Sequence, residues 1–261
     1  MKIAFFDSGL GGLGVLHAAM KRLPKEEFLF YADEDHVPYG TKSNEDILRF
    51  VDDAFAFLAG QGADAVVVAC NTATSVAVKA MREKYSFPVI GMEPAVKPAL
   101  DAKGNKRVLV VATNVTVKGE KLHNLLAKID PDGRVDRLPL QKLVDFAEEF
   151  QFAAAKEYIK EQFAPFDFAK YSALVLGCTH FNYFKDSFRE LLPEGVAIFD
   201  GNDGTVRELA RRLGIEAETG ETSPPKKTPK YFYSGREVTE AAEIMRLNRY
   251  LKRLNEMYLI N

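Results

Sequence analysis

The sequence predicts an α/β fold with mainly parallel sheets. Short apolar segments rich in β-branched residues alternate with longer segments of helical pattern, which is the order that βα units produce. Several short segments, such as AVVVA at 65–69, are apolar throughout, as strands are when helices cover both faces of a sheet. Two pairs of similar segments also recur at nearly the same offset, which indicates two related halves.

The individual elements follow from these patterns in chain order. Apolar, β-branched segments predict strands at 3–6, 28–31, 65–69, 89–90, 107–111, 173–176 and 197–199. The amphipathic segments between them predict helices at 12–22, 44–59, 73–84, 118–128, 141–162, 184–191 and 203–213. The stretch 217–230 is rich in Thr, Pro, Lys and Gly and predicts a surface loop. A last strand at 231–235 and a terminal helix at 237–257 are expected after it.

The recurring segments contain both cysteines of the chain. VVVACNTAT at 66–74 resembles LVLGCTHF at 174–181, and Cys70 and Cys178 lie 108 positions apart. FFDSG at 5–9 and VVATN at 110–114 repeat at an offset of about 105 positions. A shared offset indicates a duplicated unit with its loops at the carboxyl ends of the strands.

This duplication sets the expected domain organisation. We expect two similar α/β domains related by a pseudo-twofold axis, with the active site in the crevice between them. The first domain would comprise residues 1–95 plus 201–261, and the second residues 96–200.

Composition and charge exclude several classes of protein. Of the 261 residues, 47% are hydrophobic, which is enough for a core that needs no disulfide or metal. Basic and acidic residues are mixed and the net charge is −2, so there is no electrostatic footprint of nucleic-acid or membrane binding. Neither a secretory signal nor an apolar stretch of about 20 residues occurs, and we therefore expect a cytoplasmic protein with reduced cysteines.

Four short loops follow predicted strands and could bind a small anion. DSGLGG, CNTAT, ATNVT and GCTH are rich in hydroxyl groups and precede helices, whose first N–H groups are free to bind anions. DSGLGG matches neither the GxGxxG nor the GxxxxGK[ST] pattern, so a nucleotide site is weakly supported and a tight turn is the simpler interpretation. The candidate ligand-binding residues of these loops are Ser8, Asn71, Thr72, Thr116 and Thr179.

The two cysteines allow three interpretations. They could be inert core residues, although their position at predicted helix starts would lower the thiol pKa and favour a reactive thiolate. Cys178 and His180 could form the nucleophile and base of a hydrolase, which leaves Cys70 unexplained. Two thiols on opposite faces of a substrate could instead remove and return a proton, as inversion of a stereocentre requires. Zinc is disfavoured because there is neither a CxxC pair nor a His cluster.

Five motifs in order carry a resemblance to a known family. DSGLGG, PYG at 38–40, VVVACNTAT, ATNVT and GCTH are similar to the cofactor-independent glutamate racemases of the aspartate/glutamate racemase superfamily. The similarity runs from Met1 to about Leu213. The resemblance implies two α/β domains, no cofactor or metal, a homodimer, and production of D-glutamate for bacterial peptidoglycan.

The resemblance also implies a role for each matching residue. Cys70 would act on D-glutamate and Cys178 on L-glutamate, with Asp7 beside Cys70 and His180 beside Cys178. A capping carboxylate and a core histidine are the structural alternatives for Asp7 and His180. The residues expected to bind substrate are Asp7, Ser8, Pro38, Tyr39, Gly40, Asn71, Thr72, Thr116, Thr179 and His180.

The chain departs from the family pattern at two points. Phe181 and Asn182 stand where the family usually has Tyr-Pro after GCTH, and the acidic residue of the second half could be Asp145, Glu148 or Glu149. His180 after Cys-Thr favours glutamate by resemblance. Racemisation of a related acidic amino acid such as aspartate, or amino-acid binding without catalysis, stays an alternative.

Overall fold

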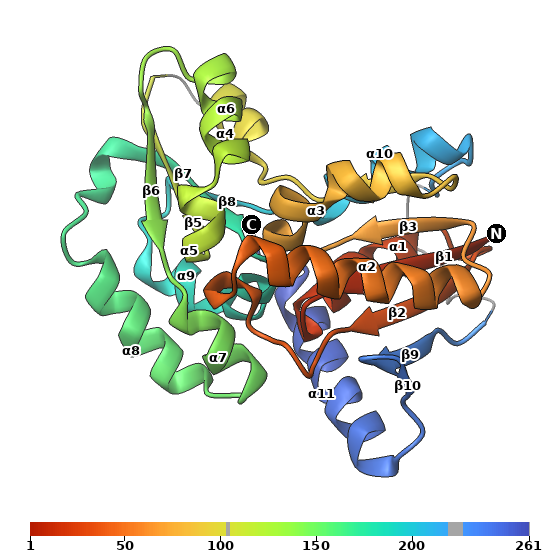
Figure 1. Cartoon of the computed structure of the whole chain (residues 1–261). Helices are drawn as coiled ribbons and strands as arrows, with labels where there is room; N and C mark the ends of the chain where they lie inside the picture. Colours follow the sequence, from red (N-terminus) through yellow and green to blue (C-terminus); the bar gives the residue numbers. More distant parts are fainter. Residues whose placement is uncertain (103–104, 219–226, 261) are drawn as a thin grey trace.

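The computed structural model describes residues 1–102, 105–218 and 227–260 and has two mainly parallel sheets flanked by helices. The strand order is β10-β9-β2-β1-β3-β4 in the first sheet and β6-β5-β7-β8 in the second. In Figure 1 the first sheet lies on the right and the second on the left. The predicted α/β class is confirmed.

The first sheet forms around β1, which pairs with β2 on one side and β3 on the other. Its strands are β1 (Lys2–Asp7), β2 (Glu27–Ala32), β3 (Ala65–Val68), β4 (Val89–Gly91), β9 (Lys230–Tyr233) and β10 (Arg236–Glu237). Its helices are α1 (Leu13–Arg22), α2 (Asn44–Gly60), α3 (Asn71–Lys84), α10 (Asn202–Leu213) and α11 (Ala241–Met257), with short 3-10 turns η1 (Leu10–Gly12) and η2 (Tyr39–Thr41).

Alternating side chains of β1 divide the core between two faces of this sheet. Ala4 and Phe6 belong to the cluster that packs under α2 and α3. Ile3 and Phe5 belong to the cluster on the other face, which includes residues of α1 and α11. Burial on both faces explains why these strands read as continuous apolar runs.

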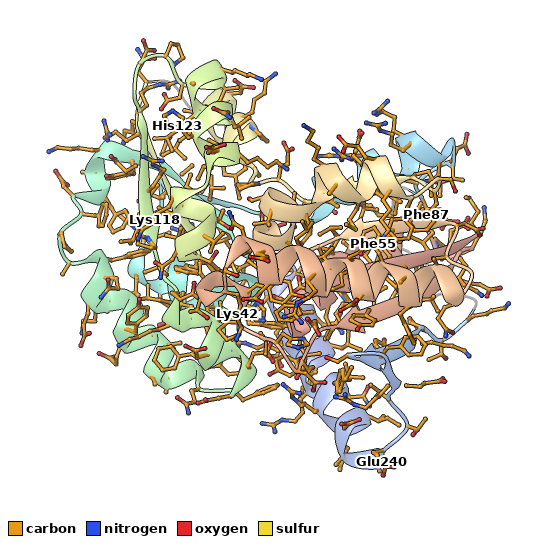
Figure 2. The ribbon with its side chains drawn as sticks, in the orientation of Figure 1. Lys42, Phe55, Phe87, Lys118, His123 and Glu240 are labelled. Atoms are coloured by element: carbon orange, nitrogen blue, oxygen red, sulfur yellow. The ribbon has the colours of Figure 1, made fainter. Side chains whose placement is uncertain are left out.

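The second sheet repeats this plan with β5 at the corresponding position. Its strands are β5 (Arg107–Ala112), β6 (Val135–Pro139), β7 (Tyr171–Gly177) and β8 (Ala197–Phe199). Its helices are α4 (Val96–Ala102), α5 (Asn114–Lys118), α6 (Glu120–Ile129), α7 (Lys142–Glu148), α8 (Phe152–Phe163) and α9 (Lys185–Leu191), with 3-10 turns η3 (Phe168–Lys170) and η4 (Thr179–Phe184). Figure 2 shows Lys118 and His123 on α5 and α6, the helices beside β6, and Glu240 directly before α11.

One core cluster is shared by the two sheets. Leu109 and Val111 of β5 belong to the same cluster as Ile3 and Phe5 of β1, so apolar contacts continue from one sheet to the other. The chain leaves the first sheet after β4 and returns to it at α10. The expected domain limits, 95/96 and 200/201, stay a prediction.

Several predicted elements were wrong. The single helix expected at 141–162 is two helices, α7 and α8, because Phe150 adopts a left-handed conformation with φ 58° between them. Strand β6 and the short helices α4 and α5 were not predicted, and the terminal helix begins at Ala241 rather than 237. Most of the loop expected at 217–230 lies outside the described residues, which omit 219–226. Within the described part of the chain, no helix has the length and apolarity needed to cross a membrane.

Candidate active site

Loops from both sheets meet around one small cavity. Cys70 follows β3 of the first sheet and Cys178 follows β7 of the second, so both cysteines stand at carboxyl ends of parallel strands. The volume of the cavity is about 10 Å³, room for about one water molecule. Its lining residues are Ser8, Pro38, Tyr39, Gly40, Cys70, Asn71, Thr72, Thr113, Val144, Cys178, Thr179 and His180.

Cys70 is the N-cap residue of α3, and its thiol is linked to Asp7 through a hydroxyl group. Its Sγ accepts a hydrogen bond from the backbone N–H of Ala73 at 3.4 Å and donates one to Ser8 Oγ at 3.5 Å. Burial, followed by the negative charge of Asp7, raises the pKa of the Cys70 thiol to about 12. The expectation that the helix start would lower this pKa was wrong, because burial outweighs the contribution of the helix.

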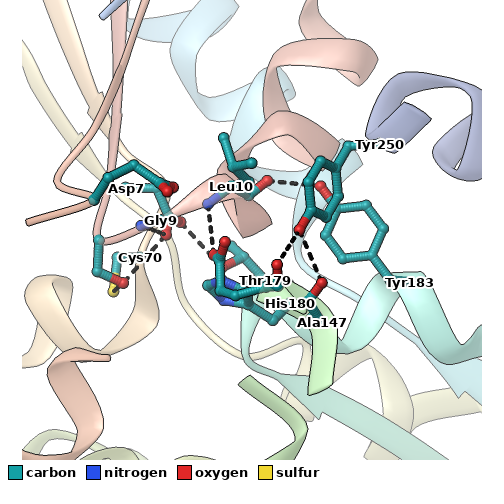
Figure 3. A network of polar contacts seen from close by, with 12 residues as sticks. Asp7, Gly9, Leu10, Cys70, Ala147, Thr179, His180, Tyr183 and Tyr250 are labelled. Carbon is teal, nitrogen blue, oxygen red and sulfur yellow. Dashed lines mark hydrogen bonds and ion pairs between the residues drawn. The ribbon is translucent and has the colours of Figure 1, made fainter. Parts of the chain in front are cut away.

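Asp7 lies at the end of β1 and is completely buried. Its Oδ1 accepts hydrogen bonds from the backbone N–H of Gly9 at 3.1 Å and from Ser8 Oγ at 3.3 Å, and its Oδ2 accepts one from Thr179 Oγ1 at 3.0 Å. Burial raises its pKa to about 6. Asp7 therefore joins the loop of the first cysteine to the loop of the second (Figure 3).

Cys178 has a histidine and a carboxylate beside it. His180 Nδ1 lies 3.9 Å from Cys178 Sγ, and His180 Nε2 lies 2.6 Å from Glu148 Oε1. Burial alone would lower the pKa of His180, but its contacts with Cys178 and Glu148 outweigh burial and raise this pKa well above the usual value. The imidazole is therefore held in its charged form beside the sulfur atom of Cys178.

Glu148 is the acidic residue that reaches this site, whereas the sequence left it open among three candidates. Its Oε1 also accepts a hydrogen bond from the backbone N–H of Leu10 at 2.9 Å. Burial would raise the pKa of Glu148, but its contacts with His180 outweigh burial and lower it. Neither Asp145 nor Glu149 makes a described hydrogen bond to His180.

Three threonine hydroxyl groups form a cluster at one side of the cavity. Thr72 Oγ1 lies 2.8 Å from Thr113 Oγ1 and 3.4 Å from Thr116 Oγ1, and Thr113 Oγ1 lies 3.1 Å from Thr116 Oγ1. Thr72 and Thr113 line the cavity, whereas Thr116 lines a separate cavity that also has Asn71 in its lining. Sequence reasoning singled out Thr116 in ATNVT and missed Thr113, although both hydroxyls follow the same strand. Asn71, next to this cluster, has a buried Oδ1 without a protein partner among the described residues.

The PYG segment, which includes the start of η2, also lines the cavity. Tyr39 is buried and donates a hydrogen bond from its hydroxyl group to Asp33 Oδ2 at 2.6 Å. Gly40 packs against the side chain of Gln141, which would lie 2.0 Å from a Cβ atom at this position. Pro38 and Tyr39 line the cavity, and Gln141, which follows β6 of the second sheet, packs against Gly40.

The Phe181-Asn182 departure is part of η4, the turn that carries His180. Phe181 is buried in the core, and Asn182 Nδ2 donates a hydrogen bond to the backbone carbonyl of Thr179 at 3.0 Å. The Asn182 side chain thus stabilises the turn of η4 by a buried hydrogen bond to its first residue.

The glycines of DSGLGG serve packing between loops, since none of the three glycines has a positive φ. A Cβ atom on Gly11 would lie 2.5 Å from Thr179 Oγ1 and 2.7 Å from the backbone nitrogen of His180. A Cβ atom on Gly9 would lie 2.3 Å from Glu148 Oε1. For Gly9 and Gly11 the close approach is made to groups that follow strands of the second sheet, whereas Gly12 approaches Asp7 and Ala69 of the first.

Comparisons with known proteins place this arrangement in a family. Residues 14–209 match the profile of the Asp/Glu/Hydantoin racemase family. The glutamate racemase of Campylobacter curvus is 51% identical to this chain over 268 aligned positions, which cover 98% of each protein. The glutamate racemase of Campylobacter concisus is 50% identical, with 100% of both proteins covered. The crystal structure of Escherichia coli glutamate racemase in complex with L-glutamate and the activator UDP-MurNAc-Ala has a TM-score of 0.81 to this chain at 29% identity, covering 97% of this chain and 94% of that one.

Proposed function

The chain belongs to the Asp/Glu/Hydantoin racemase family and is an amino-acid racemase, and we propose that it interconverts L- and D-glutamate through Cys70 and Cys178. The family resemblance that the motifs indicated is confirmed. The observation that carries the proposal is the pair of buried cysteines that reach one cavity from two different sheets. Cys70 is linked through Ser8 to the carboxylate of Asp7, whereas Cys178 lies beside the charged imidazole of His180, which contacts the carboxylate of Glu148.

The difference in charge assigns a resting state to the pair. Cys70 is a neutral thiol, since burial and Asp7 raise its pKa to about 12. We propose that Cys178 acts as the thiolate of the pair, with the charged imidazole of His180 3.9 Å from its sulfur atom. In this state Cys178 removes the α-proton of L-glutamate, and Cys70 donates its thiol proton to the opposite face of the resulting carbanion, which gives D-glutamate. The protein is left with a Cys178 thiol and a Cys70 thiolate, and proton exchange with solvent restores the resting state.

The polar groups of the cavity suit the charges of an amino acid. Hydroxyl groups of Ser8, Thr72 and Thr113 and backbone N–H groups at the start of α3 can donate to carboxylates. Asn71 Oδ1 is an acceptor that an ammonium group could satisfy. Glutamate is the substrate named for the relatives of highest identity given above, which is why we favour it over aspartate.

The role of the product, the location of the protein, its oligomeric state and its domain limits are proposals that rest on the sequence motifs. We propose that D-glutamate from this reaction supplies peptidoglycan, that the protein acts in the cytoplasm as a homodimer, and that residues 1–95 plus 201–261 and residues 96–200 are its domains. All of them follow from the family resemblance and the duplicated motifs.

The experiment that tests the function is incubation with L-glutamate, and separately L-aspartate, in heavy water without added cofactor. Deuterium should enter Cα of glutamate as the D-isomer accumulates. Cys70→Ala and Cys178→Ala should each reduce racemisation by about 10²–10⁴-fold, the range of general acid–base catalysis, in variants that thermal unfolding shows to be folded at the assay temperature. Deuterium exchange with aspartate but not with glutamate would overturn the assignment of glutamate as the substrate. Full activity of either folded variant would overturn the two-thiol mechanism, and a covalent acyl adduct on Cys178 would indicate a hydrolase.

A further inference from the structure

The terminal helix α11 forms hydrogen bonds to both segments that carry the partners of Cys178: the end of α7, with Glu148, and η4, with His180. Arg246, Tyr250 and Arg253 are spaced i, i+4 and i+7, so they share one face of the helix. Tyr250 donates from its hydroxyl group to the backbone carbonyls of Ala147 and Glu148, both at 2.9 Å, at the end of α7 (Figure 3). Arg253 Nε donates to the carbonyl of Tyr183 in η4 at 3.0 Å. The helix therefore fixes the backbone on both sides of the Glu148–His180 contact.

Arg246 contacts Glu148 through its side chain. Its Nη2 lies 2.8 Å from Glu148 Oε2, while the other carboxylate oxygen of Glu148 lies 2.6 Å from His180 Nε2. Its Nη1 lies 2.6 Å from Oε2 of Glu34, a residue that follows β2 of the first sheet. The contacts form an unbroken series from Glu34 through Arg246 and Glu148 to His180, and His180 lies beside the sulfur atom of Cys178.

We infer that Arg246 is a positioning residue for proton transfer at Cys178: it orients and charges Glu148, and Glu34 in turn holds Arg246. This inference rests on the proposed function. The two Nη groups of a guanidinium are fixed in one plane, so Arg246 holds Glu34 and Glu148 in set positions relative to each other, which a single ammonium group does less well. With one oxygen bound to Arg246, Glu148 can offer its other oxygen to His180 in one orientation only.

The surroundings argue against a salt bridge made only for stability. The side chains of Glu148 and Glu34 are 12% and 14% exposed, and Oε1 of Glu34 is buried without a hydrogen-bond partner in the described part of the chain. Burial and the charge of Glu148 raise the pKa of Glu34 to about 7. Two buried carboxylates that share one guanidinium give little or no net stabilisation, since desolvation offsets their attraction. Buried charged groups of this kind are typical of functional sites, where the charge itself takes part in the chemistry.

The sign of the expected pH effect follows from the groups that face Glu148. The positive charges of His180 and Arg246 lower its pKa. Removal of Arg246 should therefore raise the pKa of Glu148, so that a higher pH is needed to ionise it. The charged and titratable groups that interact with this site from the surrounding elements are Asp7, Glu34, Asp145, Glu148, His180, Tyr183, Tyr233, Arg246 and Tyr250.

The test compares Arg246→Met and Arg246→Lys with the wild-type enzyme over a range of pH, with L-glutamate as substrate. Arg246→Met should lower kcat by about 10- to 100-fold, the effect of a misplaced acid–base group, while KM changes by only about twofold. The acidic limb of its pH–rate profile should move to higher pH. Arg246→Lys should return this limb toward the wild-type position and restore part of kcat, because it restores the charge but not the planar geometry.

Arg211→Met is the matched control, because Arg211 pairs with Glu208 on the exposed side of α10. It should leave kcat and the pH profile unchanged. An Arg246→Met variant with wild-type kcat and an unshifted acidic limb would overturn the inference, as would a variant that only unfolds at lower temperature. If the wild-type protein does not racemise glutamate, the proposed function fails first, and this outcome is distinct from an effect confined to the variant.

Discussion

At the scale of single residues, the site holds a carboxylate where burial opposes its charge. Asp7 is completely buried, and its pKa is raised from 3.8 to about 6. The folded protein therefore binds the proton of Asp7 more tightly than the unfolded chain does. Stability from this group is complete at low pH and is lost as pH rises from about 4 to about 6. The shift corresponds to about 3 kcal/mol, which is a large fraction of a typical folding free energy.

Asp7→Asn should therefore make the protein more stable above pH 6 and less active. The amide keeps an oxygen for the N–H of Gly9, and the hydroxyl of Thr179 can rotate to accept from its NH₂ group. We expect the free energy of unfolding at pH 7 to rise by up to about 3 kcal/mol, with little change at pH 4. Chemical denaturation at both pH values measures this.

Asp53→Asn, on an exposed position of α2, is the control and should change stability little at either pH. An Asp7→Asn variant that loses stability at pH 7 would show that its hydrogen bonds outweigh the burial of its charge.

The residues that the sequence identified are those that belong to local motifs. Cys70, Cys178, Ser8 and Thr179 stand directly after strands, and such positions can be read from the chain. Glu148 could not be chosen from sequence, because Asp145 and Glu149 lie within the same few residues and only the packing of α7 decides which one faces His180. The high pKa of Cys70 also could not be predicted, since it depends on the burial of its side chain in the folded protein.

At the scale of elements, the sequence predicted those that are long and periodic. Strand β6 was missed because VDRLP carries charged residues on the edge of its sheet and is only partly buried. The break between α7 and α8 has neither Gly nor Pro. It depends on Phe150, whose ring packs 4.3 Å from the ring of Tyr250 in α11, a contact distant in sequence. Tertiary contact here overrides a continuous helical pattern.

Gly11→Ala tests the contact between η1 and η4 that no pattern revealed. The new Cβ would meet Thr179 Oγ1 at 2.5 Å and the backbone of His180 at 2.7 Å, and a backbone atom cannot move aside as a flexible side chain can. We expect a loss of stability of about 1–3 kcal/mol and a fall in kcat of about 100-fold. Thermal unfolding and racemase assays measure the two effects.

Gly204→Ala is its control, since Gly204 lies in α10 with nothing within 4 Å of the added Cβ. It should raise stability by up to about 1 kcal/mol and leave activity unchanged. Wild-type activity in Gly11→Ala would mean that the two turns are free to separate without consequence for His180.

At the scale of the whole molecule, the structure is closed around its site. The cavity of about 10 Å³ is far smaller than the roughly 300–1,000 Å³ of ordinary ligand pockets. An amino acid can enter only if the loops of the two sheets part. We expect this separation to break the hydrogen bond from the backbone N–H of Leu10 to Glu148, which joins η1 to the end of α7. Such an opening would remove Glu148 from its place as well, so that proton transfer is possible only when the substrate is enclosed.

Hydrogen exchange at two single amides tests this opening. The N–H of Leu10 bonds across the two sheets, whereas the N–H of Ala69 bonds to the carbonyl of Phe6 within the first sheet at 2.8 Å. In the free protein the amide of Leu10 should exchange faster than that of Ala69, because loop opening requires less free energy than disruption of the sheet. Saturating glutamate should slow exchange at Leu10 and leave Ala69 unchanged, since ligand binding stabilises the closed state alone. Equal protection of the two amides, unaffected by glutamate, would mean that the substrate enters by a route that leaves the contact between Leu10 and Glu148 intact.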